Sequence, residues 1–131
     1  MTIEIVFDGN KKISAKMGDQ IIHTDQPVKA GGEGTAPSPF DMFLASIGTC
    51  AGFYVKTFCD QRGISTDNIK IFQHLSWNQE SKMFDKIEIE IDIPADFPDN
   101  YKEAMLRTAD LCTVKKHLMH PPEIKVIAKT I

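Results

Sequence analysis

Two cysteines, each associated with a predicted helix, are the residues of this chain best suited to chemistry. Cys50 lies in the nearly uncharged segment 40–55, and Cys112 follows a second helical pattern near the C-terminus. A thiolate is both a nucleophile and a leaving group in thiol–disulfide exchange. The two thiols could therefore form a redox pair across a packed interface. The alternative is that both are small hydrophobic residues of the core.

The surroundings of Cys50 favour a tightly packed position. It shares one face of its predicted helix with Phe43, Ile47, Tyr54 and Phe58. Gly48 and Gly52 flank it, and a glycine inside a helix costs roughly 1 kcal/mol relative to alanine. These glycines predict that another backbone approaches the helix closely here. The third cysteine, Cys59, is about half a turn out of phase with Cys50 and is predicted to take no part.

Cys112 is followed by Thr113 and two lysines, Lys115 and Lys116. If a short helix begins there, its positive dipole end and these lysines would favour a thiolate. A metal site is the competing interpretation, because His117 and His120 are close in sequence. Their spacing from Cys112 matches no common zinc arrangement, so we predict no metal.

The glycine-rich segment 31–34 is not placed between a strand and a helix of a βαβ unit, as phosphate-binding loops are. We therefore predict no cofactor. The loop 25–39 that contains this segment is long enough to be functional, and we expect a flexible flap beside the thiol.

The elements that must position the cysteines predict an α+β fold within one domain, residues 1–131. Residues 1–24 have the pattern of a strand meander, and Ser38 and Pro39 begin a helix that runs to about Arg62, before Gly63. The further elements expected in chain order are strands over 69–77 and 87–93, helices over 101–111 and 113–119, and a strand over 123–130.

The helix that carries Cys50 is apolar on nearly every face, and Asp41 is its only charge before Lys56. Such a helix must be buried on all sides. One small sheet covers one side only, so a second copy of the chain must cover the other. The sequence therefore predicts an obligate homodimer with this helix at its centre.

Composition excludes several classes of partner. The net charge of −3 and the scattered lysines argue against nucleic acid, which requires a clustered basic surface. The apolar run 40–55 is short and contains polar residues, so no membrane partner is expected. No secretory signal pattern is visible, which predicts a cytoplasmic protein with reduced thiols.

Two segments, GEGTAPSPFDMFLASIGTCAGFYVKTFCDQRGI and LCTVKKHLMHPPEIKV, resemble the OsmC/Ohr family of osmotically inducible and organic hydroperoxide resistance proteins. The resemblance covers essentially the whole chain. It implies an OsmC-like fold, with a mostly antiparallel sheet packed on two long helices in an intertwined homodimer.

The resemblance also implies a function in oxidative stress defence. Cys50 matches the peroxidatic cysteine and Cys112 the resolving cysteine. Cys50 would attack an organic hydroperoxide, the sulfenic acid would condense with Cys112, and an external dithiol would reduce the disulfide. The alternative is a non-enzymatic member that binds an apolar small molecule in a pocket at the dimer interface.

Two positions depart from the family pattern. Active members use an N-terminal arginine, whereas the only arginines here are Arg62 and Arg107. The family's glutamate before the central helix aligns with Phe40, so the neighbouring Asp41 is the predicted acidic catalytic residue. A cation for Cys50 would have to come from Lys16, Lys29, His23 or Arg107.

Overall fold

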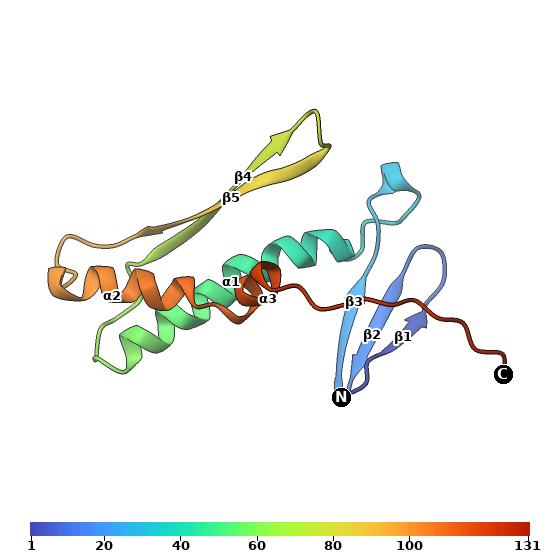
Figure 1. The fold of residues 1–131 in the computed structure, drawn as a ribbon, viewed down its shortest axis with the longest axis horizontal. Coiled ribbons are helices and arrows are strands. Elements are labelled where there is room, and N and C mark those ends of the chain that lie inside the picture. Colours follow the sequence, from blue (N-terminus) through green and yellow to red (C-terminus); the bar gives the residue numbers. More distant parts are fainter. The chain divides into compact units, whose positions relative to one another are not determined.

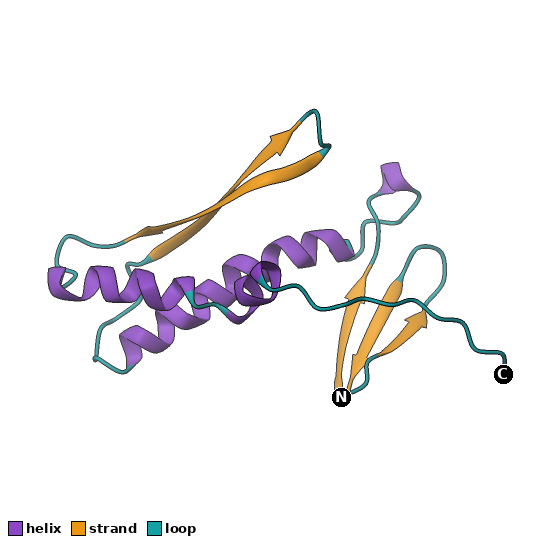
Figure 2. Cartoon of the chain, in the orientation of Figure 1, coloured by secondary structure: helices purple, strands orange, loops and turns teal.

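The computed structural model describes residues 1–131 and has the predicted α+β class (Figures 1 and 2). The chain divides into two compact units, Met1–Ala45 and Ser46–Ile131. Helix α1, Pro39–Asp60, begins in the first unit and continues in the second. A single domain over the whole chain stays a prediction.

The first unit contains the predicted strand meander. Strands β1 (Glu4–Phe7), β2 (Ile13–Met17) and β3 (Gln20–Thr24) form an antiparallel sheet in that order. The β1–β2 turn uses positive φ values at Gly9 and Asn10, as the turn signal in the sequence predicted. A short 3-10 helix, η1 (Val28–Ala30), follows β3.

The loop between β3 and α1 is fastened to Asp25, whose side chain is 0% exposed. Its carboxylate accepts hydrogen bonds from the Thr35 hydroxyl at 2.7 Å and the Thr35 N–H at 3.0 Å. Gly32 has no room for a side chain, because an added Cβ would lie 1.9 Å from the Gln26 carbonyl oxygen. Gly32 thus lets the loop fold over Asp25. The flexible flap beside the thiol stays a prediction.

Both ends of α1 follow the sequence signals. The Ser38 hydroxyl accepts a hydrogen bond from the Asp41 N–H at 3.1 Å, and the Asp41 carboxylate accepts from the Ser38 N–H at 3.3 Å. This reciprocal pair is a capping box. At the other end, Gly63 has a φ of 63° and the Ile64 N–H donates to the Cys59 carbonyl at 3.0 Å, which is a Schellman ending.

The second unit contains an antiparallel hairpin and two further helices. The hairpin consists of β4 (Lys70–Asn78) and β5 (Met83–Asp92). Helices α2 (Asp99–Asp110) and α3 (Thr113–Met119) follow it. Alternating isoleucines of the hairpin pack on a core built from α1, α2 and the loop before α2, which consists of Val55, Phe58, Cys59, Phe97, Met105 and Ala109.

The predicted final strand over 123–130 is wrong for this structure. Residues 121–131 have no regular secondary structure, and Ile124 and Val126 are 83% and 96% exposed. A strand requires neighbouring N–H and C=O groups to pair with, and the alternating apolar pattern of the segment does not supply them.

By length and composition α1 could cross a membrane. At 22 residues the helix is longer than the apolar run 40–55. The core helix of a soluble protein meets the same criterion, and Val55 and Phe58 of α1 belong to the core of the second unit.

Candidate redox site

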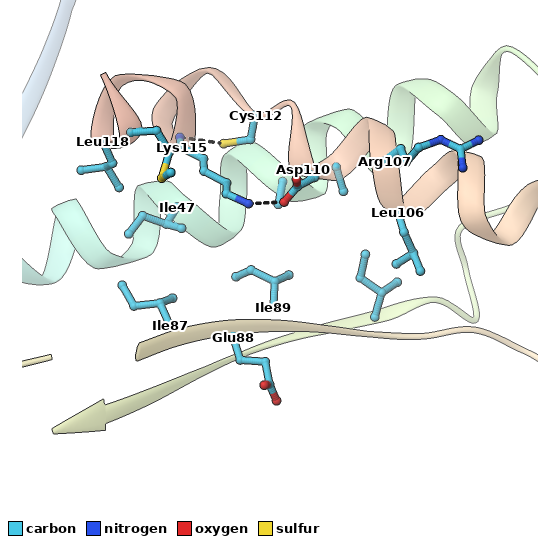
Figure 3. Close-up of a pocket in the computed structure, with 14 residues that line it drawn as sticks. Ile47, Ile87, Glu88, Ile89, Leu106, Arg107, Asp110, Cys112, Lys115 and Leu118 are labelled. Carbon is cyan, nitrogen blue, oxygen red and sulfur yellow. Dashed lines mark hydrogen bonds and ion pairs between the residues drawn. The ribbon is translucent and has the colours of Figure 1, made fainter. Parts of the chain in front are cut away.

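The two predicted redox cysteines lie on adjoining elements of the second unit. Cys50 is in the middle of α1, and Cys112 is the N-cap residue of α3. The Cys112 sulfur accepts a hydrogen bond from the Lys115 N–H at 3.4 Å (Figure 3). All three cysteines of the chain are free thiols.

The Cys50 and Cys112 side chains influence each other's ionisation: Cys112 lowers the pKa of Cys50, and Cys50 raises the pKa of Cys112. Burial raises the pKa of Cys50, but hydrogen bonds from the Val114 N–H, the Cys112 thiol and the Thr113 N–H lower it further than burial raises it. The net result is a pKa below the usual value for a thiol. Cys50 is therefore the thiol of the pair that ionises more readily.

The pKa of Cys112 shifts in the opposite direction. Burial raises it most, since the side chain is 2% exposed, and the hydrogen bond to Cys50 raises it further. The Lys115 N–H lowers it by less than these effects. A thiol that ionises more readily beside one that stays protonated is what a nucleophile and its later exchange partner require.

An apolar cleft of about 650 Å³ lies between the β4–β5 hairpin and the helices of the second unit (Figure 3). Cys112 contributes to its wall, and so do Ile47 and Ala51 on either side of Cys50. Most of the remaining lining is aliphatic: Ile87, Ile89, Ile91, Leu106, Leu118 and Met119. Such a cleft suits an apolar ligand of modest size.

A family model for OsmC-like proteins matches residues 32–127, which is most of the chain and includes both cysteines. The chain belongs to the OsmC family. This confirms the OsmC/Ohr resemblance seen in the sequence. No curated protein matches the chain significantly.

Solved structures share the fold of this OsmC family member. A Psychrobacter arcticus protein assigned to osmotic stress and detoxification response is 22% identical, with a TM-score of 0.71 over 88% of this chain and 86% of that one. An OsmC-like protein from Mycoplasma pneumoniae is 14% identical, with a TM-score of 0.65 over 92% and 87%. The organic hydroperoxide resistance protein OhrB of Bacillus subtilis is 19% identical, with a TM-score of 0.53 over 92% and 93%.

The glycines that flank Cys50 in this OsmC protein face side chains of β4, where the sequence predicted a neighbouring backbone. An added Cβ at Gly48 would lie 2.7 Å from the Gln73 Oε1 atom. At Gly52 the nearest atom is the Ile71 Cδ1 atom, 3.7 Å away. The absence of a side chain at Gly48 therefore lets the β4 strand approach α1 one half-turn before Cys50.

Three of the four cations proposed for Cys50 have other partners in the OsmC chain. Arg107 pairs with Glu103 at 3.7 Å, and Lys16 lies 3.9 Å from Glu4. The His23 Nδ1 atom is 2.8 Å from the Ser14 hydroxyl. Lys29 lies in η1. The groups that lower the pKa of Cys50 are backbone N–H groups and the Cys112 thiol.

Three further candidate side chains have contacts that stabilise the fold. Asp41 is engaged in the capping box with Ser38. Cys59 is 0% exposed in the core of the second unit, and burial raises its pKa. His117 hydrogen-bonds through its Nδ1 atom to the Thr113 carbonyl at 2.8 Å.

Sequence reasoning missed two residues of interest in this OsmC protein. The Tyr54 hydroxyl lies 2.9 Å from the Thr113 hydroxyl, which joins α1 to the first residue of α3. Asp25 is buried under the glycine-rich loop. The spacing of Tyr54 one helical turn after Cys50 was visible in the sequence, but its partner is 59 positions away.

Proposed function

We propose that the chain reduces organic hydroperoxides with Cys50 as the peroxidatic and Cys112 as the resolving cysteine. The observation that carries the proposal is the placement of the two cysteines. Cys112 begins α3 and lines an apolar cleft together with Ile47 and Ala51, which lie on either side of Cys50 in the sequence of α1. The pKa shifts, down at Cys50 and up at Cys112, agree with these roles. Membership of the OsmC family supports it, because a structural relative in Bacillus subtilis is described as an organic hydroperoxide resistance protein.

In the first step the Cys50 thiolate attacks the outer oxygen of the peroxide. An S–O bond forms, the O–O bond breaks, and the alkoxide leaves. It takes a proton from water and becomes an alcohol, which balances the proton that Cys50 released on ionising. The Cys112 thiol then attacks the Cys50 sulfenic acid, which forms the disulfide and releases water. An external dithiol reduces the disulfide by two exchange steps, through a mixed disulfide, and is itself oxidised to an intramolecular disulfide.

The apolar cleft would hold the organic part of the hydroperoxide. Its wall includes Cys112 and two residues of α1, Ile47 and Ala51, which lie on either side of Cys50 in the sequence. A substrate seated there has its polar end near the thiols, while aliphatic side chains exclude water from the sulfenic acid. The reducing cytoplasm would supply the dithiol and keep the resting thiols reduced.

The same proposal includes the homodimer that the sequence predicted. Large apolar side chains of α1 lie at the surface of the single chain, and Phe53 is 64% exposed. Ile124 and Val126 of the C-terminal segment are more exposed still. A second copy of the chain would remove these side chains from water. Sedimentation of the purified chain tests this assembly, and a monomer at micromolar concentration would contradict it.

The activity is tested by intact-mass analysis after adding one equivalent of cumene hydroperoxide to the reduced protein. We expect the wild type to lose two hydrogens within seconds. Cys112→Ser should instead gain one oxygen on Cys50, and Cys50→Ser should show neither change. An unchanged mass over minutes in a folded wild-type protein would refute the peroxidase assignment.

A second function is favoured by the size of the cleft. About 650 Å³ is sufficient for a small apolar ligand without any reaction at sulfur. In that case the chain is a non-enzymatic binding protein. Cys50→Ser would then bind an apolar fluorescent probe as tightly as the wild type does, and the wild type would be inert to peroxide.

A further inference from the structure

One contact outside the thiol pair joins the two elements that carry it. Tyr54 is four residues after Cys50, so the two side chains lie on the same face of α1, one turn apart. The Tyr54 hydroxyl is hydrogen-bonded to the Thr113 hydroxyl at 2.9 Å. Thr113 is the first residue of α3 and directly follows Cys112.

The Tyr54–Thr113 contact lies next to Cys112, at the start of α3. The Thr113 and Val114 N–H groups and the Cys112 thiol are the groups that lower the pKa of Cys50. All three belong to the short turn that begins α3. A hydrogen bond from α1 to Thr113 fixes that turn against the face of α1 that carries Cys50.

We propose that Tyr54 is a positioning residue that holds Thr113, and with it Cys112, in contact with Cys50. The inference rests on the proposed function only in taking Cys50 and Cys112 as the reacting pair. Tyr54 touches neither the substrate nor the sulfur atoms in this role. It acts by restricting the motion of the α3 start relative to α1.

Two effects should follow when the Tyr54 hydroxyl is removed. The N–H and S–H donors would spend less time on the Cys50 sulfur, so the Cys50 thiolate would form at higher pH. The Cys112 thiol would also meet Cys50 less often. A neutral hydrogen bond contributes about 0.5–1.5 kcal/mol, so the effective concentration of Cys112 at Cys50 should fall about twofold to tenfold.

The experiment compares Tyr54→Phe with the wild type in two assays that need no hydroperoxide. The first follows alkylation of Cys50 by iodoacetamide as a function of pH, read on the Cys50 peptide by mass spectrometry. The second equilibrates the protein with reduced and oxidised glutathione, where oxidised glutathione supplies the oxidising equivalents. The ratio of Cys50–Cys112 disulfide to Cys50–glutathione mixed disulfide then gives the effective concentration.

Matched variants distinguish the loss of the Tyr54–Thr113 hydrogen bond from a general loss of stability. Tyr101→Phe makes the same chemical change in α2, where Tyr101 packs edge-on to Phe58, and should leave both assays unchanged. Thr113→Val removes the other partner and should reproduce Tyr54→Phe, with little further loss in the double variant. Thr113→Ser retains a hydroxyl and should restore wild-type behaviour.

The outcomes are distinct. The positioning role is supported if Tyr54→Phe and Thr113→Val raise the midpoint pH of Cys50 alkylation and lower the effective concentration of Cys112 at Cys50. Tyr101→Phe and Thr113→Ser should change neither value. Unchanged values in both variants would overturn it. If the wild type fails to reduce hydroperoxides while these shifts are present, the proposed function fails and the positioning role stands.

Discussion

The Lys115 N–H donates a hydrogen bond to the Cys112 sulfur at 3.4 Å, which makes Cys112 the N-cap residue of α3. The same side chain lowers the pKa of Cys50. The influence of one thiol on the other is therefore tied to the way α3 begins. A change at Cys112 should act both on the ionisation of Cys50 and on the helix that follows.

The first prediction concerns the pH dependence of the two thiols. The pKa of Cys50 is lowered and that of Cys112 is raised relative to an ordinary thiol. As pH rises, Cys50 should therefore become reactive first, with Cys112 still protonated. Peptide-resolved alkylation over pH 6–11 should give two separate midpoints, Cys50 being lower. Coincident midpoints would contradict the assignment of roles.

The lowered pKa of Cys50 also makes the stability of the folded protein depend on pH. A thiol whose pKa is lowered by folding adds stability above its unfolded pKa of about 8.5, and that stability is lost as pH falls through the folded pKa. Removing Cys50 should therefore reduce the pH dependence of unfolding on the alkaline side. The measurement is the melting temperature of the wild type and of Cys50→Ala at pH 7 and pH 9.5. The wild type should exceed the variant by more at the higher pH.

The second prediction compares two replacements of Cys112. Serine retains a donor toward the Cys50 sulfur, whereas alanine removes it. A hydrogen bond to a charged group contributes about 1.5–3 kcal/mol, so Cys112→Ala should react with hydroperoxide about tenfold to a hundredfold more slowly than Cys112→Ser at neutral pH. Trapping of the Cys50 sulfenic acid with dimedone gives both rates. Equal rates would show that the Cys112 hydrogen bond does not activate Cys50.

Local sequence patterns predicted most of the elements because each pattern involves neighbouring residues. The Ser38 cap, the Gly63 ending and the alternating isoleucines of β5 were all confirmed. The cysteine pair was also predicted, although its activation was not. The family resemblance implies a cation beside Cys50, whereas the groups that lower its pKa are N–H groups at the start of α3 and the Cys112 thiol.

What the sequence did not predict depends on contacts between distant positions. Tyr54 and Thr113 are 59 positions apart, and no periodicity indicates that they meet. The C-terminal segment shows the converse case. Ile124 and Val126 have the alternation of a strand, yet alternation describes only which side chains share a face. It does not provide the strand that must lie beside them.

The third prediction tests the two roles of Asp41. Its hydrogen bonds are those of a capping residue, whereas the family resemblance implies an acidic residue that activates the thiol. If capping is its role, Asp41→Ala and Ser38→Ala should each destabilise the protein by about 1 kcal/mol, with unchanged rates of Cys50 oxidation. Urea unfolding and the hydroperoxide assay measure the two effects. A rate loss in Asp41→Ala alone would support the activating role.

The fourth prediction concerns Asp25 and the loop that covers it. Hydrogen bonds from the Thr35 hydroxyl, the Thr35 N–H and two further backbone N–H groups lower the pKa of Asp25 to about 2, against an ordinary value of 3.8, although burial opposes this. The folded pKa is the lower one, so the stabilisation is complete above about pH 4. It should be lost as pH falls toward 2.

Asp25→Asn provides the test because the amide does not titrate in this range. Its NH₂ group also adds donors where the loop already presents N–H groups, so the variant should be less stable than the wild type at pH 7. The difference in melting temperature should narrow steadily between pH 4 and pH 2, as the wild type loses its charged carboxylate. Amide hydrogen exchange should locate the loss in residues 26–35, with the core helices of the second unit unaffected. A difference that is constant with pH would mean that Asp25 stabilises the loop by packing and not by charge.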